Sequence, residues 1–547
     1  MAAVDEAPTL FLRKATGLVK GWSKFDAFVY SFVSVNFVCL GLFFALAVLG
    51  YVPGGQILPA LLVSGVFVSF LVVTYAMLIS VMPRAGGDYV WQSRVLGGGI
   101  AFVLSVTGWW FILWYWTPVY ATILNVEVLQ PLAAVFKWGG LLTWLGTKNG
   151  LFFICVVTAV LAGFLVALGM EGYAKVQKYC FYLGMAGLAV IMLVMLFGSR
   201  AGFQSAFNAQ SASLFGTHGD TYAETVKLAA GSLPAKIGFS PFFGPSMLLI
   251  PFLCFWILWP NWGATLYGEV RGASDFKRVM SGMMWGLWVT VVIAIVFLLL
   301  ASKFFGWDFF NAGNVNFINY FYGYTTSNTI PVWTYPPLMV GFFFRNNLVA
   351  ALIVIVFGAW FLGWAGTLFL SSTRVIFAAA FDRILPERVA DVSEKRHVPV
   401  WALVLMLGPA IVVSAFYAYS LSFRTYILDA TLVIAVTFFG TCIAAAILPW
   451  RKKHLYQNSA IAKYNVAGIP LITITGGLSA LFLGYNLYKW LWPPASKGNL
   501  YAINNKSSLV FMGSMYVLAL VIYVVAKIYR KSQGVDLNAI YQEIPVE

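Results

Sequence analysis

The sequence predicts an all-α integral membrane protein with about 12 transmembrane helices. Hydrophobic residues make up 61% of the 547 residues and charged residues only 10%, whereas soluble globular proteins carry about 25% charged residues. Twelve stretches of about 20 or more mostly apolar residues follow one another along the chain. This composition excludes a secreted enzyme and a nucleic-acid-binding protein. Because the stretches do not alternate between apolar and polar residues, an outer-membrane β-barrel is excluded as well.

The spacing of the apolar stretches and of the basic residues predicts the topology. We expect spans at about 26–50, 57–82, 98–124, 149–169, 174–198, 246–268, 279–303, 348–379, 399–420, 425–449, 468–490 and 509–529. About two thirds of the 34 Lys and Arg residues lie on the side that holds the N-terminus, which the positive-inside rule assigns to the cytoplasm. Both termini of this multi-pass plasma-membrane protein are therefore expected to be cytoplasmic, and the net charge of +15 reflects topology.

Several signals of other protein classes are missing from the sequence. The five cysteines fall inside apolar stretches without paired spacing, so neither a disulfide framework nor a metal site is expected. Residues 1–25 are polar and basic and do not resemble a cleavable signal peptide. Neither a catalytic motif nor a nucleotide-binding loop occurs. We therefore expect no enzyme, no ATP-driven pump and no cofactor.

Ionisable residues are rare in the predicted spans, and we expect most of them at helix ends, where a charge costs less than at mid-membrane. These residues are Asp26, Glu127, Glu171, Glu269, Arg374 and Asp382. Asp429 lies about one turn into span 10 and is interpreted as a helix-end or gate residue. Two long outward loops, at about 199–245 and 304–347, either cap an external vestibule or form an inert surface. Asn505 begins a glycosylation sequon in the last outward loop.

Span 6 contains the strongest sign of an interrupted helix. It reads FWILWPNWG over residues 255–263. Pro260 lacks an N–H group and its ring clashes with the carbonyl group one turn earlier, and Asn261 and Gly263 lie beside it. Transporter helices that break at mid-membrane present carbonyl and N–H groups to a polar solute. A simple proline kink is the alternative for this span alone.

Span 1 is the second helix in which we expect an interruption. Ser34 and Asn36 form a polar pair near mid-membrane, and Gly41 follows. Spans 1 and 6 are the first helices of two potential five-helix repeats, and an odd number of spans per repeat inverts the second repeat. Matched interruptions in two halves are the sequence sign of an inverted-repeat transporter site. The alternative is a Ser/Asn pair that hydrogen-bonds to a neighbouring helix.

Spans 3 and 8 supply further candidates for the same cavity. Span 3 is dense in tryptophan and tyrosine, including Trp110, and these rings either pack helices or form a pocket or gate. Thr367 and Ser371 of span 8 are four residues apart and so share a helical face. Their hydroxyl oxygens suit a sodium ion, since hard cations prefer oxygen ligands. Hydrogen bonds back to the helix carbonyls are the alternative.

Three predicted cytoplasmic segments carry recognisable motifs. They read MPRAGGDYV (82–90) with Ser93, Arg94 and Gly97, then GEVRGAS (268–274), and then STR (372–374), FA (377–378), DRILP (382–386) and HVP (397–399). In their order, and in the side of the membrane on which they fall, these segments resemble the signature motifs of the amino acid–polyamine–organocation (APC) superfamily of permeases. The resemblance covers about residues 20–450.

This resemblance implies a five-plus-five inverted repeat of the APC/LeuT type, with two additional C-terminal helices. It divides the chain into a cytoplasmic segment (1–25), a first repeat (26–198), an extracellular loop (199–245), a second repeat (246–449), spans 11–12 (450–530) and a cytoplasmic tail (531–547). It further implies alternating access and an amino acid bound at interrupted spans 1 and 6. Carried over by position, the substrate-binding residues are Ser34, Val35, Asn36, Gly41, Trp110, Phe255, Leu258, Trp259 and Asn261.

The sequence departs from the superfamily pattern at positions that bear on the solute and the coupling ion. Only Gly41 remains of the glycines of span 1, Trp259 replaces a small residue, and Gly187 lies near the position of a lysine in some proton-coupled members. We expect a permease for amino acids or related small solutes, coupled to Na+ or H+ if to any ion. The alternatives are a membrane subunit or sensor that keeps the fold without transport and, less favoured, a membrane-embedded enzyme. A homo-oligomer is compatible with the sequence.

Overall fold

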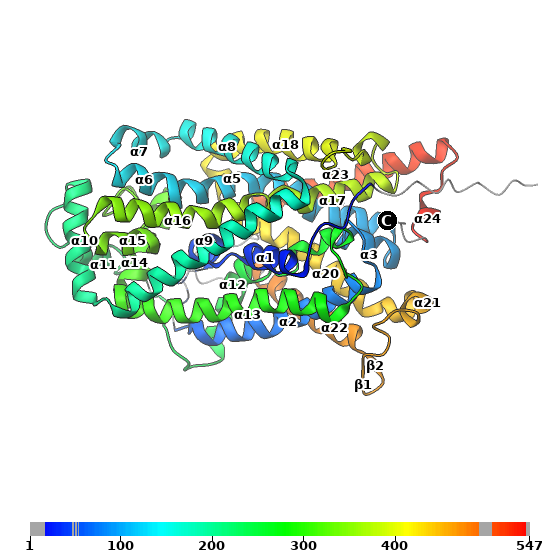
Figure 1. Cartoon of the computed structure of the whole chain (residues 1–547), viewed down its shortest axis with the longest axis horizontal. Helices are drawn as coiled ribbons and strands as arrows, with labels where there is room; N and C mark the ends of the chain where they lie inside the picture. Colours follow the sequence, from blue (N-terminus) through cyan, green and yellow to red (C-terminus); the bar gives the residue numbers. More distant parts are fainter. Residues whose placement is uncertain are drawn as a thin grey trace, which may run out of the picture.

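The computed structural model describes residues 17–45, 49, 52, 54–232, 234–491 and 506–542. It is a bundle of long helices that run mainly along one axis (Figure 1). Within the described residues, twelve helices are long and apolar enough to cross a membrane. The predicted all-α, twelve-span class is confirmed. Asn505 and the side chain of Asp429 lie outside the described residues.

The twelve spans consist of one or several helical segments each. In chain order they are α1 (Lys24–Val35) with η1 (Phe37–Ala45); α2 (Ile57–Val81); α4 (Gly98–Val106), η3 (Thr107–Phe111), α5 (Ile112–Leu124), η4 (Asn125–Leu129) and α6 (Gln130–Val135); α8 (Lys148–Ala167); α9 (Gly169–Phe197); η5 (Gly244–Leu249), α12 (Ile250–Ile257) and η6 (Trp262–Glu269); α13 (Phe276–Ala301); α16 (Asn347–Ala365) with α17 (Thr367–Phe381); α18 (Val400–Tyr419); α20 (Ile427–Arg451); α22 (Leu471–Leu491); and α23 (Lys506–Ser532).

Shorter elements connect the spans at the two ends of the bundle. They are α3 (Asp88–Val95), α7 (Gly139–Leu145), α10 (Arg200–Phe215), α11 (Thr221–Leu228), η7 (Ser302–Gly306), α14 (Trp307–Phe321), α15 (Pro336–Phe343), η8 (Glu387–Ala390), α19 (Leu421–Arg424), α21 (Lys453–Gln457), the antiparallel pair β1 (Asn465–Val466) and β2 (Ile469–Pro470), and α24 (Leu537–Ile540). Figure 1 shows α10, α11, α14 and α15 at one end, which we call the loop end. The opposite end, which we call the signature end, holds α3, α21 and α24.

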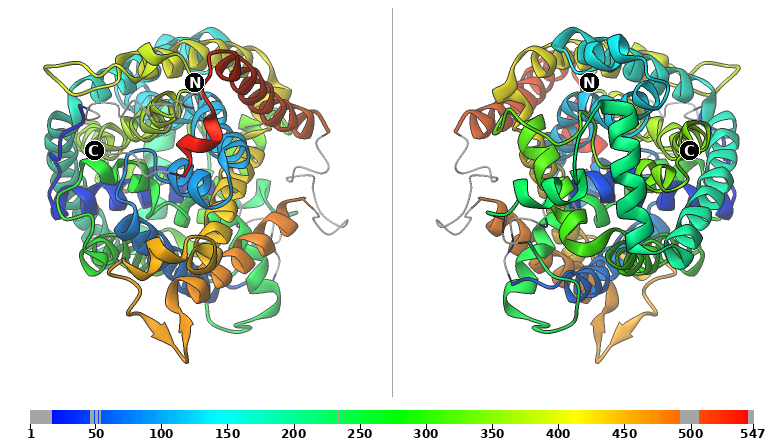
Figure 2. Two further views of the ribbon diagram at one scale, coloured as in Figure 1. Left: turned by 90° about the vertical axis from the view of Figure 1, so that its right-hand side faces the viewer. Right: turned by 90° about the vertical axis from the view of Figure 1, so that its left-hand side faces the viewer.

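Spans 1 and 6 form the centre of the bundle. In each of them, 83% of the most apolar window is buried, compared with 28% in α9, α18 and α23. A helix that is apolar all round is stable only where other helices or lipid surround it. Spans 1 and 6 are surrounded by protein, whereas α22 and α23 lie at the edge of the bundle in both end-on views (Figure 2).

Two buried ion pairs tie the helices together at the signature end. Arg374, expected near a helix end, instead lies within α17, and its Nε is 2.7 Å from Glu269 Oε1, with both side chains at most 1% exposed. Arg94 of α3 contacts both carboxylate oxygens of Asp382, at 2.6 and 2.9 Å. Bidentate arginine–carboxylate pairs are among the strongest charge-assisted contacts. The pairs connect span 6 to span 8 and α3 to the end of span 8.

A third buried carboxylate at the signature end has hydroxyl and indole partners. Asp88 accepts hydrogen bonds from Tyr75, Thr441 and Trp109, which belong to spans 2, 10 and 3. Burial raises the pKa of the Asp88 carboxyl group to about 6, while these hydrogen bonds lower it. Near neutral pH the ionised carboxylate can therefore accept all three hydrogen bonds and connect three spans.

The Arg374–Glu269 pair gives a direct test of this packing. Arg374→Ala leaves Glu269 as a buried carboxylate without its cation, a change that typically costs about 3–5 kcal/mol. We expect the apparent melting temperature in detergent to fall strongly. The exposed Lys395→Ala is the control and should leave it nearly unchanged. The double variant Glu269→Gln/Arg374→Met should lose less than Arg374→Ala, and equal melting temperatures for all three variants would contradict the assignment.

Candidate functional site

Span 1 is interrupted at Asn36, within the predicted segment. Helix α1 ends at Val35, and Asn36 has a φ of 41° in the left-handed region. Asparagine tolerates this conformation better than most residues because its short side chain hydrogen-bonds locally. Here Asn36 Oδ1 accepts a hydrogen bond from the Cys39 backbone N–H at 3.0 Å. The span then continues as a π-helix, a form that is often found at functional sites.

Span 6 is interrupted between Ile257 and Trp262, around Pro260. The α-helix α12 ends at Ile257 and the chain resumes as the 3₁₀-helix η6 at Trp262. The backbone carbonyl of Pro260 accepts a hydrogen bond of 2.8 Å from Ser31 Oγ of span 1. A freed backbone group in a membrane requires such a partner. A side chain of span 1 therefore stabilises the interruption of span 6.

Close contact between spans 1 and 6 explains the glycine at position 41. A Cβ atom on Gly41 would lie 3.2 Å from Trp256 Cε2 and 2.9 Å from Phe37 Cδ2. Any larger residue would push the indole of Trp256 away from η1. Gly41 thus permits the close packing of the two interrupted spans. The indole ring of Trp256 in span 6 lies against the space that a side chain at position 41 would need.

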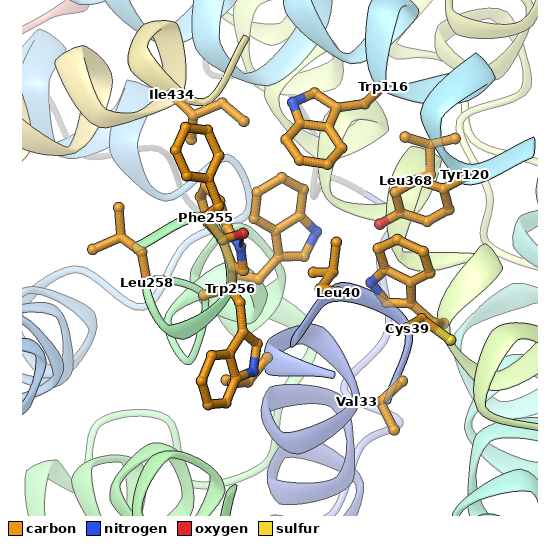
Figure 3. Packing of buried hydrophobic residues seen from close by; sticks show 14 of the residues in the cluster. Val33, Cys39, Leu40, Trp116, Tyr120, Phe255, Trp256, Leu258, Leu368 and Ile434 are labelled. Atoms are coloured by element: carbon orange, nitrogen blue, oxygen red, sulfur yellow. Dashed lines mark hydrogen bonds between the residues drawn. The ribbon is translucent and has the colours of Figure 1, made fainter. Parts of the chain in front are cut away.

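A small cavity of about 20 Å³ lies beside the two interruptions. It has room for about one water molecule. Spans 1, 3, 6, 8 and 10 contribute its walls, and Figure 3 shows Leu40, Trp116, Tyr120, Leu368 and Ile434 around this region. The lining residues are Ser34, Leu40, Leu113, Trp116, Tyr120, Trp259, Trp262, Trp364, Leu368 and Ile434.

Two of the predicted substrate-binding residues, Ser34 and Trp259, line this cavity. Trp110 points elsewhere, since its Nε1 donates to the carbonyl oxygen of Leu405 in α18 at 3.2 Å. The ring of Phe255 packs against Trp490 of α22. The others, Val35, Asn36, Gly41, Leu258 and Asn261, are buried in or next to the interrupted segments without lining the cavity.

On spans 3 and 8, sequence reasoning offered Trp116 and Trp364 as candidates for the cavity, and both line it. It missed Leu113 and Tyr120, which lie three and four residues from Trp116 on one side of span 3. It also missed Leu368, four residues after Trp364 on span 8. This periodicity was available in the sequence. The side of each helix that faces spans 1 and 6 was not, because it depends on how the spans pack.

The cavity wall is aromatic and uncharged. The rings of Tyr120 and Trp364 stack with centroids 3.4 Å apart, and Trp259 and Trp262 meet edge-on at 5.4 Å. None of the lining side chains carries a formal charge. Aromatic walls favour apolar or aromatic groups through burial and ring stacking, and they attract cations through their π faces.

The hydroxyl groups of the predicted cation site have protein partners. Thr367 Oγ1 donates to the carbonyl oxygen of Trp364, three residues earlier, at 2.7 Å, and lies 3.1 Å from the Tyr120 hydroxyl. Ser371 Oγ donates instead to the carbonyl oxygen of Trp262 in span 6, at 3.0 Å, and shares a hydrogen bond with Tyr30. Thr367 thus makes the expected bond to its own helix, whereas Ser371 links spans 1, 6 and 8. The sodium site stays a prediction.

Two buried asparagine amides at the interruptions have unused hydrogen-bonding groups. Asn36 Nδ2 and both polar atoms of Asn261 have no hydrogen-bond partner among the described residues, and both side chains are fully buried. An unpaired polar group of this kind costs about 1–3 kcal/mol and therefore requires an explanation. The two amides mark the interruptions as places where a polar ligand would gain hydrogen bonds.

Comparison with known proteins agrees with the motifs and the fold. No curated protein matches the chain at a significant level. A family model described as amino acid permease matches residues 32–538. The matched range covers the twelve spans of the described structure, apart from the first residues of span 1. The resemblance to the APC superfamily is thereby confirmed. The chain belongs to the amino acid permease family.

Proposed function

We propose that this permease is a secondary active transporter that binds an amino acid or a related small solute between spans 1, 3, 6 and 8. The observation that carries the proposal is the pair of matched helix interruptions next to a cavity at the centre of the bundle. Interrupted helices at the middle of a membrane are the usual binding elements of inverted-repeat transporters. Both interruptions lie in the two most deeply buried spans.

The polar and apolar parts of the region suggest how a zwitterionic solute would be held. The unpaired amides of Asn36 and Asn261 can meet the charged or polar groups of the solute. The aromatic lining suits its side chain once the bundle opens and the small cavity widens, and the absence of charge among the lining residues disfavours a charged side chain. The proposed substrate class is therefore neutral amino acids, or related solutes, with apolar or aromatic side chains.

The ion pairs of the signature end suggest how the cavity is closed on that side. Trp262 lines the cavity and packs on Trp109 at 4.6 Å between ring centroids. Trp109 in turn donates to Asp88, next to the Arg94–Asp382 and Arg374–Glu269 pairs. In alternating access, opening on this side would separate these contacts and opening on the other side would preserve them. Packed interfaces of this kind switch between discrete arrangements.

One observation supports a second candidate function, a membrane subunit or sensor that does not transport. Backbone hydrogen bonds within span 1 begin again directly after the interruption, because the N–H groups of Leu40 and Gly41 both donate to the Asn36 carbonyl oxygen. Fewer backbone groups are therefore available to a solute than in a fully unwound segment. Solute binding without transport would favour this candidate.

The Asn261 amide provides the sharpest test of the binding site. Asn261→Leu removes an unpaired amide, so we expect the solute-free protein to melt at a higher temperature. The same change, and Asn261→Ala, should weaken solute binding by about 5- to 150-fold, the equivalent of 1–3 kcal/mol. Pro260→Ala should also impair transport without preventing insertion. Isothermal titration calorimetry measures the affinity, with the exposed Asn458→Ala as control.

Unchanged affinity and uptake in both Asn261 variants and in Pro260→Ala would remove span 6 from the binding site. A lower melting temperature for Asn261→Leu in the absence of solute would indicate that the amide already has a structural partner.

An uptake panel tests the proposed function itself. Proteoliposomes containing the purified chain should accumulate labelled neutral amino acids above the level of protein-free liposomes, with aromatic and branched side chains preferred over charged ones. Imposed sodium and proton gradients identify the coupling ion. If sodium drives uptake, Ser371→Ala should reduce the stimulation of uptake by a sodium gradient more than Ser372→Ala does. The Ser372 hydroxyl donates a hydrogen bond within its own helix and serves as the control. No uptake or exchange of any solute under all gradients would contradict the transporter assignment.

A further inference from the structure

Glu127 is a buried carboxyl group in span 3 that the proposed function does not use. It was expected at a helix end, but the structure corrects this position, because η4 holds Glu127 and α6 extends the same span to Val135. Its side chain is only 1% exposed. Glu127 interacts with Cys39 of η1, which directly precedes the cavity residue Leu40. Glu127 therefore faces span 1 near the cavity, seven residues beyond Tyr120 toward the loop end.

Among the described residues, no positively charged side chain interacts with the carboxyl group of Glu127. The side chains that interact with its carboxyl group are Cys39 of η1 and Tyr335. Oε1 has no hydrogen-bond partner among the described residues. Besides η1 and the segment of Tyr335, the elements that pack most closely against η4 are α5, α6 and α16. Of these, α6 and α16 carry no ionisable residue, and the ionisable residues of α5 are Tyr115 and Tyr120.

An ionised carboxylate is costly in such an environment. Neither a cation nor a set of strong donors compensates for its lost hydration, so the neutral acid is the form that the closed bundle stabilises. Ionisable groups inside a membrane protein that lack a partner are rare, and they commonly mark ion or proton pathways. The thiol of Cys39 and the hydroxyl of Tyr335 can each exchange a hydrogen bond with the protonated acid.

Tyr335 connects this group to the loop end. It immediately precedes α15, in the segment between α14 and α15. The neighbouring residues Ile330, Val332 and Trp333 are each only 1% exposed, and the ring of Trp333 packs on Phe43 of η1 at 5.8 Å. The segment 330–335 thus covers both the end of span 1 and Glu127. An opening of the bundle at this end that displaced Tyr335 would let water reach the carboxyl group.

We propose that Glu127, enclosed by Cys39 and Tyr335, is a proton-binding site whose occupancy is linked to opening of the loop end. In the closed form Glu127 holds a proton, and it loses that proton when displacement of segment 330–335 hydrates the carboxylate. This inference rests on the proposed transport function for its purpose, since it couples solute movement to a pH gradient. The existence of the site does not depend on which solute is carried.

Infrared difference spectroscopy of the reconstituted protein tests the site without any solute. Spectra recorded at stepwise increasing pH should show the carbonyl stretch of a protonated carboxylic acid, which disappears as Glu127 ionises. Glu127→Gln should lose this band, whereas Glu224→Gln, an exposed acid of α11, should retain it. Tyr335→Phe should shift the pH at which the band disappears, and this variant keeps the test available if Glu127→Gln fails to fold.

Identical pH-difference spectra for the wild type and Glu127→Gln would overturn the proposal, as would a wild-type protein without such a band. A Tyr335→Phe variant with an unchanged midpoint would also count against it. In transport assays, Glu127→Gln should reduce uptake driven by a pH gradient by roughly tenfold, within the usual range of coupling between two sites, while solute exchange continues. If the wild type transports nothing, the proposed function fails, and the infrared spectra still decide whether Glu127 binds a proton.

Discussion

Backbone groups that leave a helix inside a membrane must find other partners, and this constraint shapes the centre of the bundle. Pro260 ends α12, and the freed carbonyl group of Pro260 receives the Ser31 hydroxyl of span 1. Asn36 ends α1, and its own side chain accepts the N–H of Cys39. Because lipid offers no hydrogen-bonding groups to replace water, the interruption of span 6 depends on span 1, whereas the interruption of span 1 is stabilised within its own chain segment. The burial of spans 1 and 6 follows from the same requirement.

The signature motifs acquire a physical meaning from the ion pairs. Arg94, Glu269, Arg374 and Asp382 come from three separate segments and are joined into two buried pairs at one end of the bundle. A buried pair need not stabilise a fold more than apolar packing would, but loss of one partner is costly. Such contacts suit a closure that exists in two arrangements, since they are either fully made or fully hydrated. At the loop end, by contrast, the ring of Trp333 in segment 330–335 packs on Phe43 of η1.

Much of the architecture could be predicted from the sequence because it depends on local properties. Apolar length predicts the twelve spans, and Pro260 predicts the interruption of span 6 because proline cannot donate a hydrogen bond. The interruption at Asn36 was expected within a few residues, yet its continuation as a π-helix was not. The structure also places Arg374 and Glu127 inside their helices. The cost of burying a charge had led us to expect both residues at helix ends. Their burial depends on neighbours far apart in the chain.

The cavity was harder to predict for the same reason. Ser34 and Trp259 were expected from their positions in spans 1 and 6, while Trp116, Tyr120 and Leu368 are selected by the rotation of spans 3 and 8 about their axes. Trp110, close in sequence to Trp116, faces α18 instead. A helical period identifies a face, but the partner of that face is decided by packing across the whole bundle. Asn261 was expected from the interruption, and its unpaired amide is visible only in three dimensions.

The most direct measurement of the central claim is an electron cryomicroscopy map of the protein bound to a solute identified by uptake or calorimetry. The account predicts density for the solute between the interrupted segments, with its polar groups at the Asn261 amide and its side chain against Trp116, Tyr120 and Trp259. Solute density outside the centre of the bundle, or spans 1 and 6 seen as continuous α-helices, would contradict it.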